Sequence, residues 1–344
     1  MRASVVCRSA AATAAIVLAG GVSRAVTQTS SGCALPAGRS SFVFRSGFWL
    51  NLHNFLHRGA KERQGINNEL PAAMTVAVED TVRARPLTPP EQRAWESALQ
   101  VYVTNQLALG KSDSIVQRLN ERLAAARDDG ELRDTDIDPA VRQALLMAAP
   151  VYRLVWWPVH DRRNREWIAS LQALFGPREA CLARSMARAL AAEWPALPII
   201  VDASVYASWF GAYMTQHPVH ITMSSNARGN QGSLGIEGLL HEAGHSLTGP
   251  LDSALAVTAA RTGHVLPREL AHLTLFYTAG ETVHDQIPDH VPYAASFGVW
   301  KQSADAQRYR ALLDREWRPH LQGVRSFAEA ISRVVERLPP VPAQ

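Results

Sequence analysis

Two histidines and a glutamate within five residues are the strongest chemical signal in this 344-residue sequence. His241, Glu242 and His245 form the pattern H-E-x-x-H. On a helix the two histidines lie one above the other, while Glu242 points about 100° to the side. Imidazoles in this arrangement bind zinc, and the adjacent carboxylate acts on a water at the metal. The pattern predicts one zinc ion per chain, with Glu242 as general base. A merely packed or solvated histidine pair is the alternative.

The H-E-x-x-H pattern lies in a predicted helix. Ser233 is a typical N-cap residue, Glu237 suits the first turn, and Gly249-Pro250 is a stop signal. Apolar residues recur at helical spacing on the face opposite the histidines: Ile236, Leu239, Leu240, Ala243 and Leu247. Glycine is unfavourable inside a helix, so three glycines indicate that other parts of the chain pack closely here: Gly235, Gly238 and Gly244.

The third zinc ligand has to come from elsewhere, because catalytic zinc takes three protein ligands and leaves one position for water. Segment 267–286 predicts a buried helix that is apolar almost all round. Tyr277, Glu281 and Asp285 form its polar stripe. A buried carboxylate is unfavourable unless it is paired or binds a metal, so Glu281 is the predicted ligand. His284, three residues further on, is the alternative ligand.

Glu281 and Asp285 also form the pattern E-x-x-x-D. An H-E-x-x-H followed by a helix with E-x-x-x-D resembles the gluzincin metallopeptidases, the superfamily of thermolysin and neprilysin. The resemblance covers residues 198–295, although 35 residues separate His245 from Glu281, more than in thermolysin. It implies a zincin-like catalytic domain with His241, His245 and Glu281 as metal ligands. It also implies that Asp285 orients a ligand histidine.

The same resemblance implies where a substrate lies. Segment 219–224 alternates apolar and polar residues with period two, which predicts a half-buried strand. In the zincin arrangement the strand before the metal helix is an edge strand, to which a peptide substrate adds as a further strand. His220 and Thr222 are therefore the predicted substrate-binding residues, and the expected reaction is hydrolysis of peptide bonds.

Such a reaction also needs a hydrogen-bond donor for the oxygen that becomes negative in the transition state. Tyr293, His284 and Tyr277 are candidates. Tyr293 is favoured as a catalytic residue because it lies in a loop soon after the predicted ligand helix. Two other classes of function stay open. One is a zinc hydrolase of a non-peptide amide or ester, and the other is a non-catalytic zinc-binding or helical binding protein.

Secondary-structure signals predict a predominantly helical α+β fold. Thr88-Pro89-Pro90-Glu91 is a capping box that begins a helix, and further helices follow up to Trp194. Strands near residues 199–201 and 219–224 then predict a small antiparallel sheet that precedes the H-E-x-x-H helix. We divide the chain into four parts: a signal peptide (1–25), a linker (26–40), a helical subdomain (41–197) and a zincin-like catalytic subdomain (198–344).

The N-terminus has the features of a secretory signal peptide. Arg2 and Arg8 precede a short apolar run, and small residues favour cleavage after Ala25. An uncleaved membrane anchor is the alternative. We expect a periplasmic or secreted protein without stable membrane association after cleavage. Cleavage lowers the formal net charge from +4 to +1, so the composition does not indicate a nucleic-acid partner. The expected partner is a peptide or protein substrate, and the oligomeric state is unknown.

Two other features carry weaker hypotheses. Cys33 and Cys181 could pair in an exported protein or stay free, and no spacing rule decides between these outcomes. His53 and His57 lie four residues apart, but a structural zinc needs four ligands, so we interpret them as a packed or surface pair. His160-Asp161 is interpreted as part of a structural turn.

Overall fold

The computed structural model describes residues 40–65, 83, 85–105, 113–126, 132, 137–207, 211–216 and 219–338. The chain divides into two compact units, Met1–Gly32 and Cys33–Gln344, and all described residues lie in the second. The predicted signal peptide, Cys33 and nearly all of the linker lie outside the described residues. Cys181 is disulfide-bonded, and its partner also lies outside them. Within the described ranges, every helix is too short or too polar to cross a bilayer.

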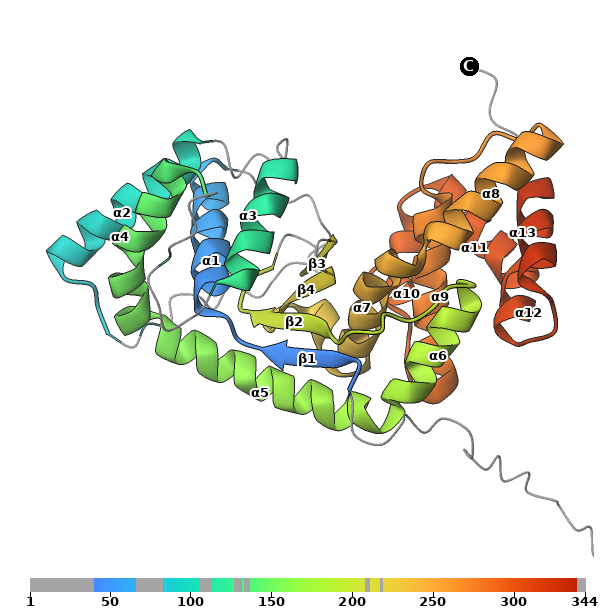
Figure 1. Cartoon of the computed structure of the whole chain (residues 1–344), viewed down its shortest axis with the longest axis horizontal. Helices are drawn as coiled ribbons and strands as arrows, with labels where there is room; N and C mark the ends of the chain where they lie inside the picture. The colour runs from blue at the N-terminus through green and yellow to red at the C-terminus, as the bar shows by residue number, and fades with distance from the viewer. Residues whose placement is uncertain are drawn as a thin grey trace, which may run out of the picture. The chain divides into compact units, whose positions relative to one another are not determined.

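Helices dominate the described residues, as predicted (Figure 1). The strands are β1 (Phe42–Arg45), β2 (Ile199–Ser204), β3 (Ala212–Gln216) and β4 (Val219–Ser224). The helices are α1 (Phe48–Arg63), α2 (Pro89–Thr104), α3 (Asp113–Ala125), α4 (Pro139–Val155), α5 (Trp157–Phe175), α6 (Glu179–Ala189), α7 (Gly232–Gly244), α8 (Gly249–Thr262), α9 (Leu270–Gln286), α10 (Tyr293–Ser296), α11 (Ala304–Glu316), α12 (Arg318–Leu321) and α13 (Phe327–Glu336). Short 3-10 turns include η3 (Arg228–Asn230) and η4 (His245–Leu247).

The strands form one mixed sheet that precedes α7 in the chain. Its order is β1-β2-β4-β3. β1 pairs parallel with β2 and β2 pairs parallel with β4, while β3 is antiparallel to β4. The predicted antiparallel sheet is therefore wrong in its topology. β1 comes from the N-terminal part of the chain and joins β2 through a long helical connection, which permits parallel pairing.

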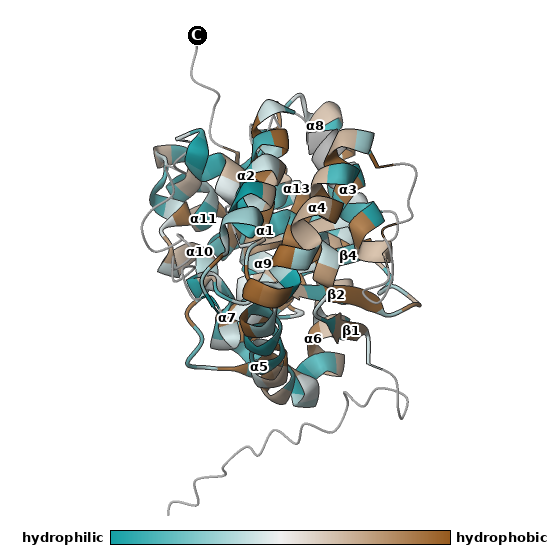
Figure 2. Cartoon of the chain, turned by 90° about the vertical axis from the view of Figure 1, so that its left-hand side faces the viewer, coloured by the Kyte–Doolittle hydropathy of each residue, from teal (hydrophilic) through white to brown (hydrophobic). Residues whose placement is uncertain are grey.

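Buried apolar side chains form two main clusters. One unites α1, α2 and α4, with Phe48, Leu56, Tyr102, Leu145 and Tyr152 among its members. The other unites the sheet with α5, α6, α7, α9 and α13, with Trp167, Met186, Ile221, Leu240 and Val334 among its members. β2 is largely brown in Figure 2 because most of its residues are apolar, and almost all of them are buried. α5 and α6 thus share a core with α7, although the predicted boundary at 197/198 separates them.

Local signals predicted several helix ends well. α2 begins at Pro89, and the Thr88 backbone N–H donates to the Glu91 carboxylate at 2.9 Å, as expected for a capping box. Gly249-Pro250 ends the α7–η4 segment but also begins α8, because proline suits the first turn of a helix. His160 lies inside α5 and not in a turn.

Two buried histidines outside the H-E-x-x-H segment are packing residues. The Tyr102 hydroxyl lies 3.0 Å from Nδ1 of His53, and the Tyr152 hydroxyl lies 2.8 Å from Nδ1 of His160. Burial lowers the pKa of each histidine to about 3, so both are neutral at pH 7. The only group of metal-binding side chains found among the described residues lies elsewhere, so His53 and His57 stay interpreted as a packed pair.

Candidate metal centre and active site

α7 and the turn that follows it carry the H-E-x-x-H residues. His241 is buried in the last turn of α7, and His245 begins η4. Ser233 is not the N-cap, since Gln231 holds that position, and the Ser233 hydroxyl lies instead 2.9 Å from Nδ1 of His290. A Cβ atom at Gly244 would lie 2.5 Å from Leu275 of α9. The glycine therefore lets α9 pack against the histidine end of α7, as the glycines of this helix predicted.

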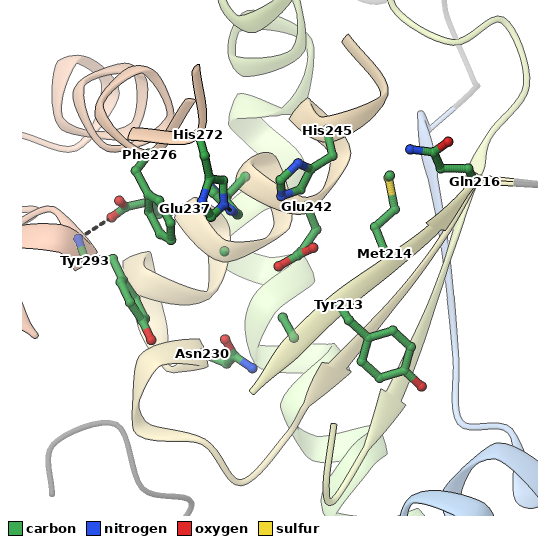
Figure 3. A pocket seen from close by; sticks show the side chains of 13 residues that line it. Tyr213, Met214, Gln216, Asn230, Glu237, Glu242, His245, His272, Phe276 and Tyr293 are labelled. Carbon is green, nitrogen blue, oxygen red and sulfur yellow. Dashed lines mark hydrogen bonds between the residues drawn. The ribbon is translucent and has the colours of Figure 1, made fainter. Parts of the chain in front are cut away.

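A third imidazole, from α9, completes the group. One ligand atom each from His241, His245 and His272 lie within 4.8 Å of one another. Figure 3 shows His245 and His272 on neighbouring helical segments of the site. The Nε2 atoms of His241 and His272 are 3.2 Å apart. Two nitrogens on a tetrahedral zinc, each about 2.0–2.1 Å from the metal, are separated by roughly 3.3 Å. The spacing of these two nitrogens therefore fits a shared zinc ion.

The protonation of the three imidazoles also fits a metal site. Burial, with smaller contributions from His245 and His272, holds the pKa of His241 well below the usual range. Burial, with a smaller contribution from His272, lowers the pKa of His245 to about 4, and burial lowers that of His272. Neutral imidazoles keep a lone pair for the metal. Phe276 lies over His241 with ring centroids 3.9 Å apart and limits the orientations open to that imidazole.

Glu281, the predicted third ligand, is not in this group. Glu281 follows His272 by nine positions, which places the two about 180° apart around α9. His272 faces α7, whereas the Glu281 carboxylate pairs with Arg318 at 2.9 Å. The Glu281 carboxylate is only partly buried, and the partner that compensates for its lost water is a guanidinium instead of a metal. The third side chain beside His241 and His245 is therefore a histidine. Glu281 and Asp285, the E-x-x-x-D residues of the gluzincin resemblance, lie away from this group.

The neighbours of Glu281 follow it to the other side of α9. His284 and Tyr277 line a separate cavity of about 280 Å³ together with Glu281. The Tyr277 hydroxyl donates to Asp314 at 2.6 Å, and Nδ1 of His284 lies 2.9 Å from the His290 carbonyl oxygen. Asp285 is exposed and does not contact a ligand histidine. The Nδ1 atom of His241 has no hydrogen-bond partner among the described residues.

Glu242 and Tyr293 do share a cavity with the three histidines. This cavity has a volume of about 450 Å³ and also contains Met214, Asn230 and Phe276 on its walls. Figure 3 shows the Glu242 carboxylate between α7 and the sheet, and the Tyr293 ring on the opposite wall. Burial raises the pKa of Glu242 to about 8 and that of Tyr293 to about 12. Tyr293 therefore remains a hydrogen-bond donor at pH 7.

The edge strand that lines the cavity is β3, not β4. β3 contributes Ala212, Tyr213, Met214 and Gln216 to the cavity, while β4 lies between β2 and β3. Figure 3 shows that the Tyr213 side chain itself points away from the cavity.

His220 and Thr222, the predicted substrate-binding residues, are buried and do not line the cavity. Nε2 of His220 lies 2.6 Å from the Asp202 carboxylate inside the structure. The strand at 219–224 is present, but the prediction that it is half-buried is wrong, because every residue after Val219 is buried. Met223 packs towards α7, whereas His220 and Thr222 lie on the other face of β4.

No protein-family model, curated protein or solved structure matches this chain. The site combines three neutral imidazoles, a neighbouring carboxylate, a tyrosine hydroxyl and a sheet edge around one cavity.

Proposed function

We propose that the chain is a zinc-dependent hydrolase that cleaves peptide bonds. The observation that carries the proposal is the convergence of His241, His245 and His272 beside Glu242 in one cavity. Three protein ligands leave one position for water, which is the ligand number of catalytic rather than structural zinc. A non-catalytic zinc site would need neither the adjacent carboxylate nor a cavity of this size.

The side chains of the cavity have distinct roles in this reaction. A zinc ion held by the three imidazoles would supply the positive charge that activates a water, polarises the scissile carbonyl and favours the ionised form of Glu242. Glu242 accepts the proton of the attacking water and delivers it to the leaving nitrogen. Tyr293 donates a hydrogen bond to the carbonyl oxygen as negative charge develops there. Phe276 excludes water from one side of the imidazoles.

The position of β3 favours a peptide over a small amide or ester. An edge strand offers backbone N–H and C=O groups at the spacing of an extended chain. β3 runs along the cavity from Ala212 to Gln216, so a peptide that adds to this edge would pass Glu242 and the three histidines. This role passes to β3 from β4, which is covered on both edges.

The proposed location is supported by the chemistry of the cysteines and by the N-terminal sequence. Cys181 is disulfide-bonded, and structural disulfides form in oxidising compartments. Together with the predicted signal peptide, this bond supports the proposal of a periplasmic or secreted enzyme. Intact-mass measurement of the exported chain should show cleavage after Ala25, and a chain that still begins at Met1 would favour an anchored protein.

The test of function is a digest of a mixture of unstructured peptides, analysed by mass spectrometry. The zinc-loaded chain should cleave peptides, a chelator should stop cleavage, and added zinc should restore it. Glu242→Gln is the matched control, because it should keep the zinc and lose cleavage. A protein that binds zinc and hydrolyses only small amides or esters would support the non-peptide alternative. A protein that binds no supplied zinc would contradict the proposal.

A further inference from the structure

The cavity contains a second buried carboxylate that the proposed reaction does not use. Glu237 lies on α7 one turn before His241, and only 1 % of its surface is exposed. A carboxylate buried to this degree destabilises a fold unless its hydrogen bonds compensate for the lost water. The partners of Glu237 therefore indicate what the carboxylate does.

Both partners of Glu237 belong to the segment that carries Tyr293. Its Oε2 atom lies 2.8 Å from Nε2 of His290 and accepts the backbone N–H of Tyr293 at 2.7 Å. His290 in turn is held from two sides, by the Ser233 hydroxyl at 2.9 Å and by Nδ1 of His284 at its carbonyl oxygen. The segment 290–293 is thus fastened to α7 and α9 through a network centred on Glu237.

Two glycines allow this segment to approach so closely. A Cβ atom at Gly280 of α9 would lie 2.8 Å from Pro292 and 3.0 Å from the second oxygen of Glu237. A Cβ atom at Gly229 of η3 would lie only 2.4 Å from the Tyr293 ring. The Tyr293 ring therefore fits between η3 and Phe276, with its hydroxyl towards Asn230 in Figure 3.

We propose that Glu237 is a positioning residue, whose carboxylate holds segment 290–293 so that Tyr293 reaches the substrate carbonyl oxygen in the metal cavity. This proposal deepens the proposed function and rests on it. Glu237 binds the backbone N–H of Tyr293 itself, so loss of the carboxylate acts directly on the residue that donates to the substrate. Loss of the Glu237 carboxylate should leave the three imidazoles and Glu242 in place, because the hydrogen bonds of Glu237 go to His290 and Tyr293 instead.

Three substitutions separate the parts of this role. Glu237→Gln keeps an oxygen that can accept both hydrogen bonds and removes only the charge. Glu237→Ala removes the acceptor. Glu237→Asp keeps the charge but withdraws it by one methylene, and it serves in place of the alanine variant if that variant does not fold. Glu179→Ala is the matched control, because buried Glu179 also accepts a backbone N–H, that of Ser41 before β1.

The first readout is amide hydrogen exchange in the metal-free protein, which does not depend on activity. Loss of a buried hydrogen bond to a charged acceptor should raise exchange at the Tyr293 amide by at least about tenfold. We expect this rise in Glu237→Ala and Glu237→Asp but not in Glu237→Gln. In Glu179→Ala the rise should occur near Ser41 and not at Tyr293. Unchanged exchange at Tyr293 in both the alanine and aspartate variants would overturn the proposal.

The second readout is the kinetics of the zinc-loaded protein. Glu237→Ala should keep about one zinc and a KM within about twofold, and its kcat should fall to the level of Tyr293→Phe. Both substitutions would then remove the same interaction, the hydrogen bond from Tyr293 to the substrate. The double variant should therefore be no slower than the single variants. Multiplicative losses, or a loss of zinc, would overturn the positioning role. If the wild type cleaves no peptide, the proposed function fails, while the exchange result still decides whether Glu237 fastens Tyr293.

Discussion

The identity of the third metal ligand gives the sharpest test of the site, because two residues of one helix make opposite predictions. His272→Ala removes an imidazole of the candidate zinc group. Glu281→Ala removes a carboxylate about 180° away on α9. We expect zinc affinity to fall strongly in the first variant and to stay unchanged in the second.

The size of the effect can be worked from the ligand set. Four-ligand zinc sites in small domains bind with apparent free energies of about 10–16 kcal/mol at pH 7, so one ligand accounts for roughly 2.5–4 kcal/mol. At 1.4 kcal/mol for each factor of ten, His272→Ala should raise the Kd for zinc by about 10²-fold or more. Glu281→Ala breaks an ion pair whose Arg318 side chain is 42 % exposed. The free energy of unfolding should change by no more than about 1 kcal/mol.

Competition titration against a chromophoric zinc chelator measures both affinities on the same metal-free preparations, and thermal unfolding checks that each variant is folded. Cobalt substitution adds a spectroscopic readout, because loss of one nitrogen ligand changes the visible absorption of the bound ion. His284→Ala is a further control, since His284 lines the cavity of Glu281 and not that of the metal group. A Glu281→Ala variant that loses more zinc affinity than His272→Ala would refute the three-histidine site and restore the gluzincin ligand set.

Three other predictions concern catalysis and stability. Glu242→Gln should keep zinc and lower kcat by about 10²–10⁴-fold; substantial remaining turnover would place the base elsewhere. Tyr293→Phe should lower kcat by roughly 10–10³-fold with KM little changed, as steady-state kinetics would show. His53 and His160 have folded pKa values of about 3, below the unfolded value of 6.5, so the unfolded chain takes up protons first and stability falls as pH drops from about 6.5 towards 3. Each histidine accounts for at most about 5 kcal/mol of this loss in the free energy of unfolding. Urea unfolding at several pH values should show that stability depends less on pH in His160→Gln than in the wild type.

The H-E-x-x-H helix could be predicted from the sequence because its information is local. The spacing of His241 and His245 and the apolar stripe opposite them depend only on the 3.6-residue period. The glycine at 244 indicated close packing before the packing partner, Leu275, was known. Tertiary contacts decide which face of a helix is buried, but they do not change which residues share that face. A prediction based on helical spacing therefore holds in the folded protein.

The third ligand could not be chosen in the same way, because α9 has two faces that both carry groups able to bind a metal. The polar stripe of Tyr277, Glu281 and Asp285 favoured one face, whereas His272 alone marked the other. Only the packing of α9 on α7 decides which face meets the histidine pair. The 180° relation between His272 and Glu281 would have shown that one of the two must be excluded.

The sheet also depends on contacts between residues far apart in the chain, which local sequence patterns do not reveal. A run of β-branched residues placed β2, and period-two alternation placed β4. Neither signal could show the parallel pairing of β1 with β2, which joins residues 42–45 to residues 199–202. Period-two alternation also cannot tell which face of a strand is turned to the core when both faces are covered. His220 and Thr222 therefore fell on the wrong side of β4, and the role proposed for them passes to the edge strand β3.

Ser233 and Glu237 show the same ambiguity next to the candidate metal site. Both have the residue types of a helix start, a hydroxyl cap followed by an acid in the first turn, and both were interpreted as such. In the structure neither caps α7: one bonds the His290 ring and the other bonds His290 and the Tyr293 amide. The same donors and acceptors can satisfy a helix end or a distant loop, and a local pattern cannot distinguish these uses. When the expected cap residues of a helix do not cap it, their hydrogen-bond partners show which other segment packs against the helix. For α7 this segment is 290–293, which carries Tyr293.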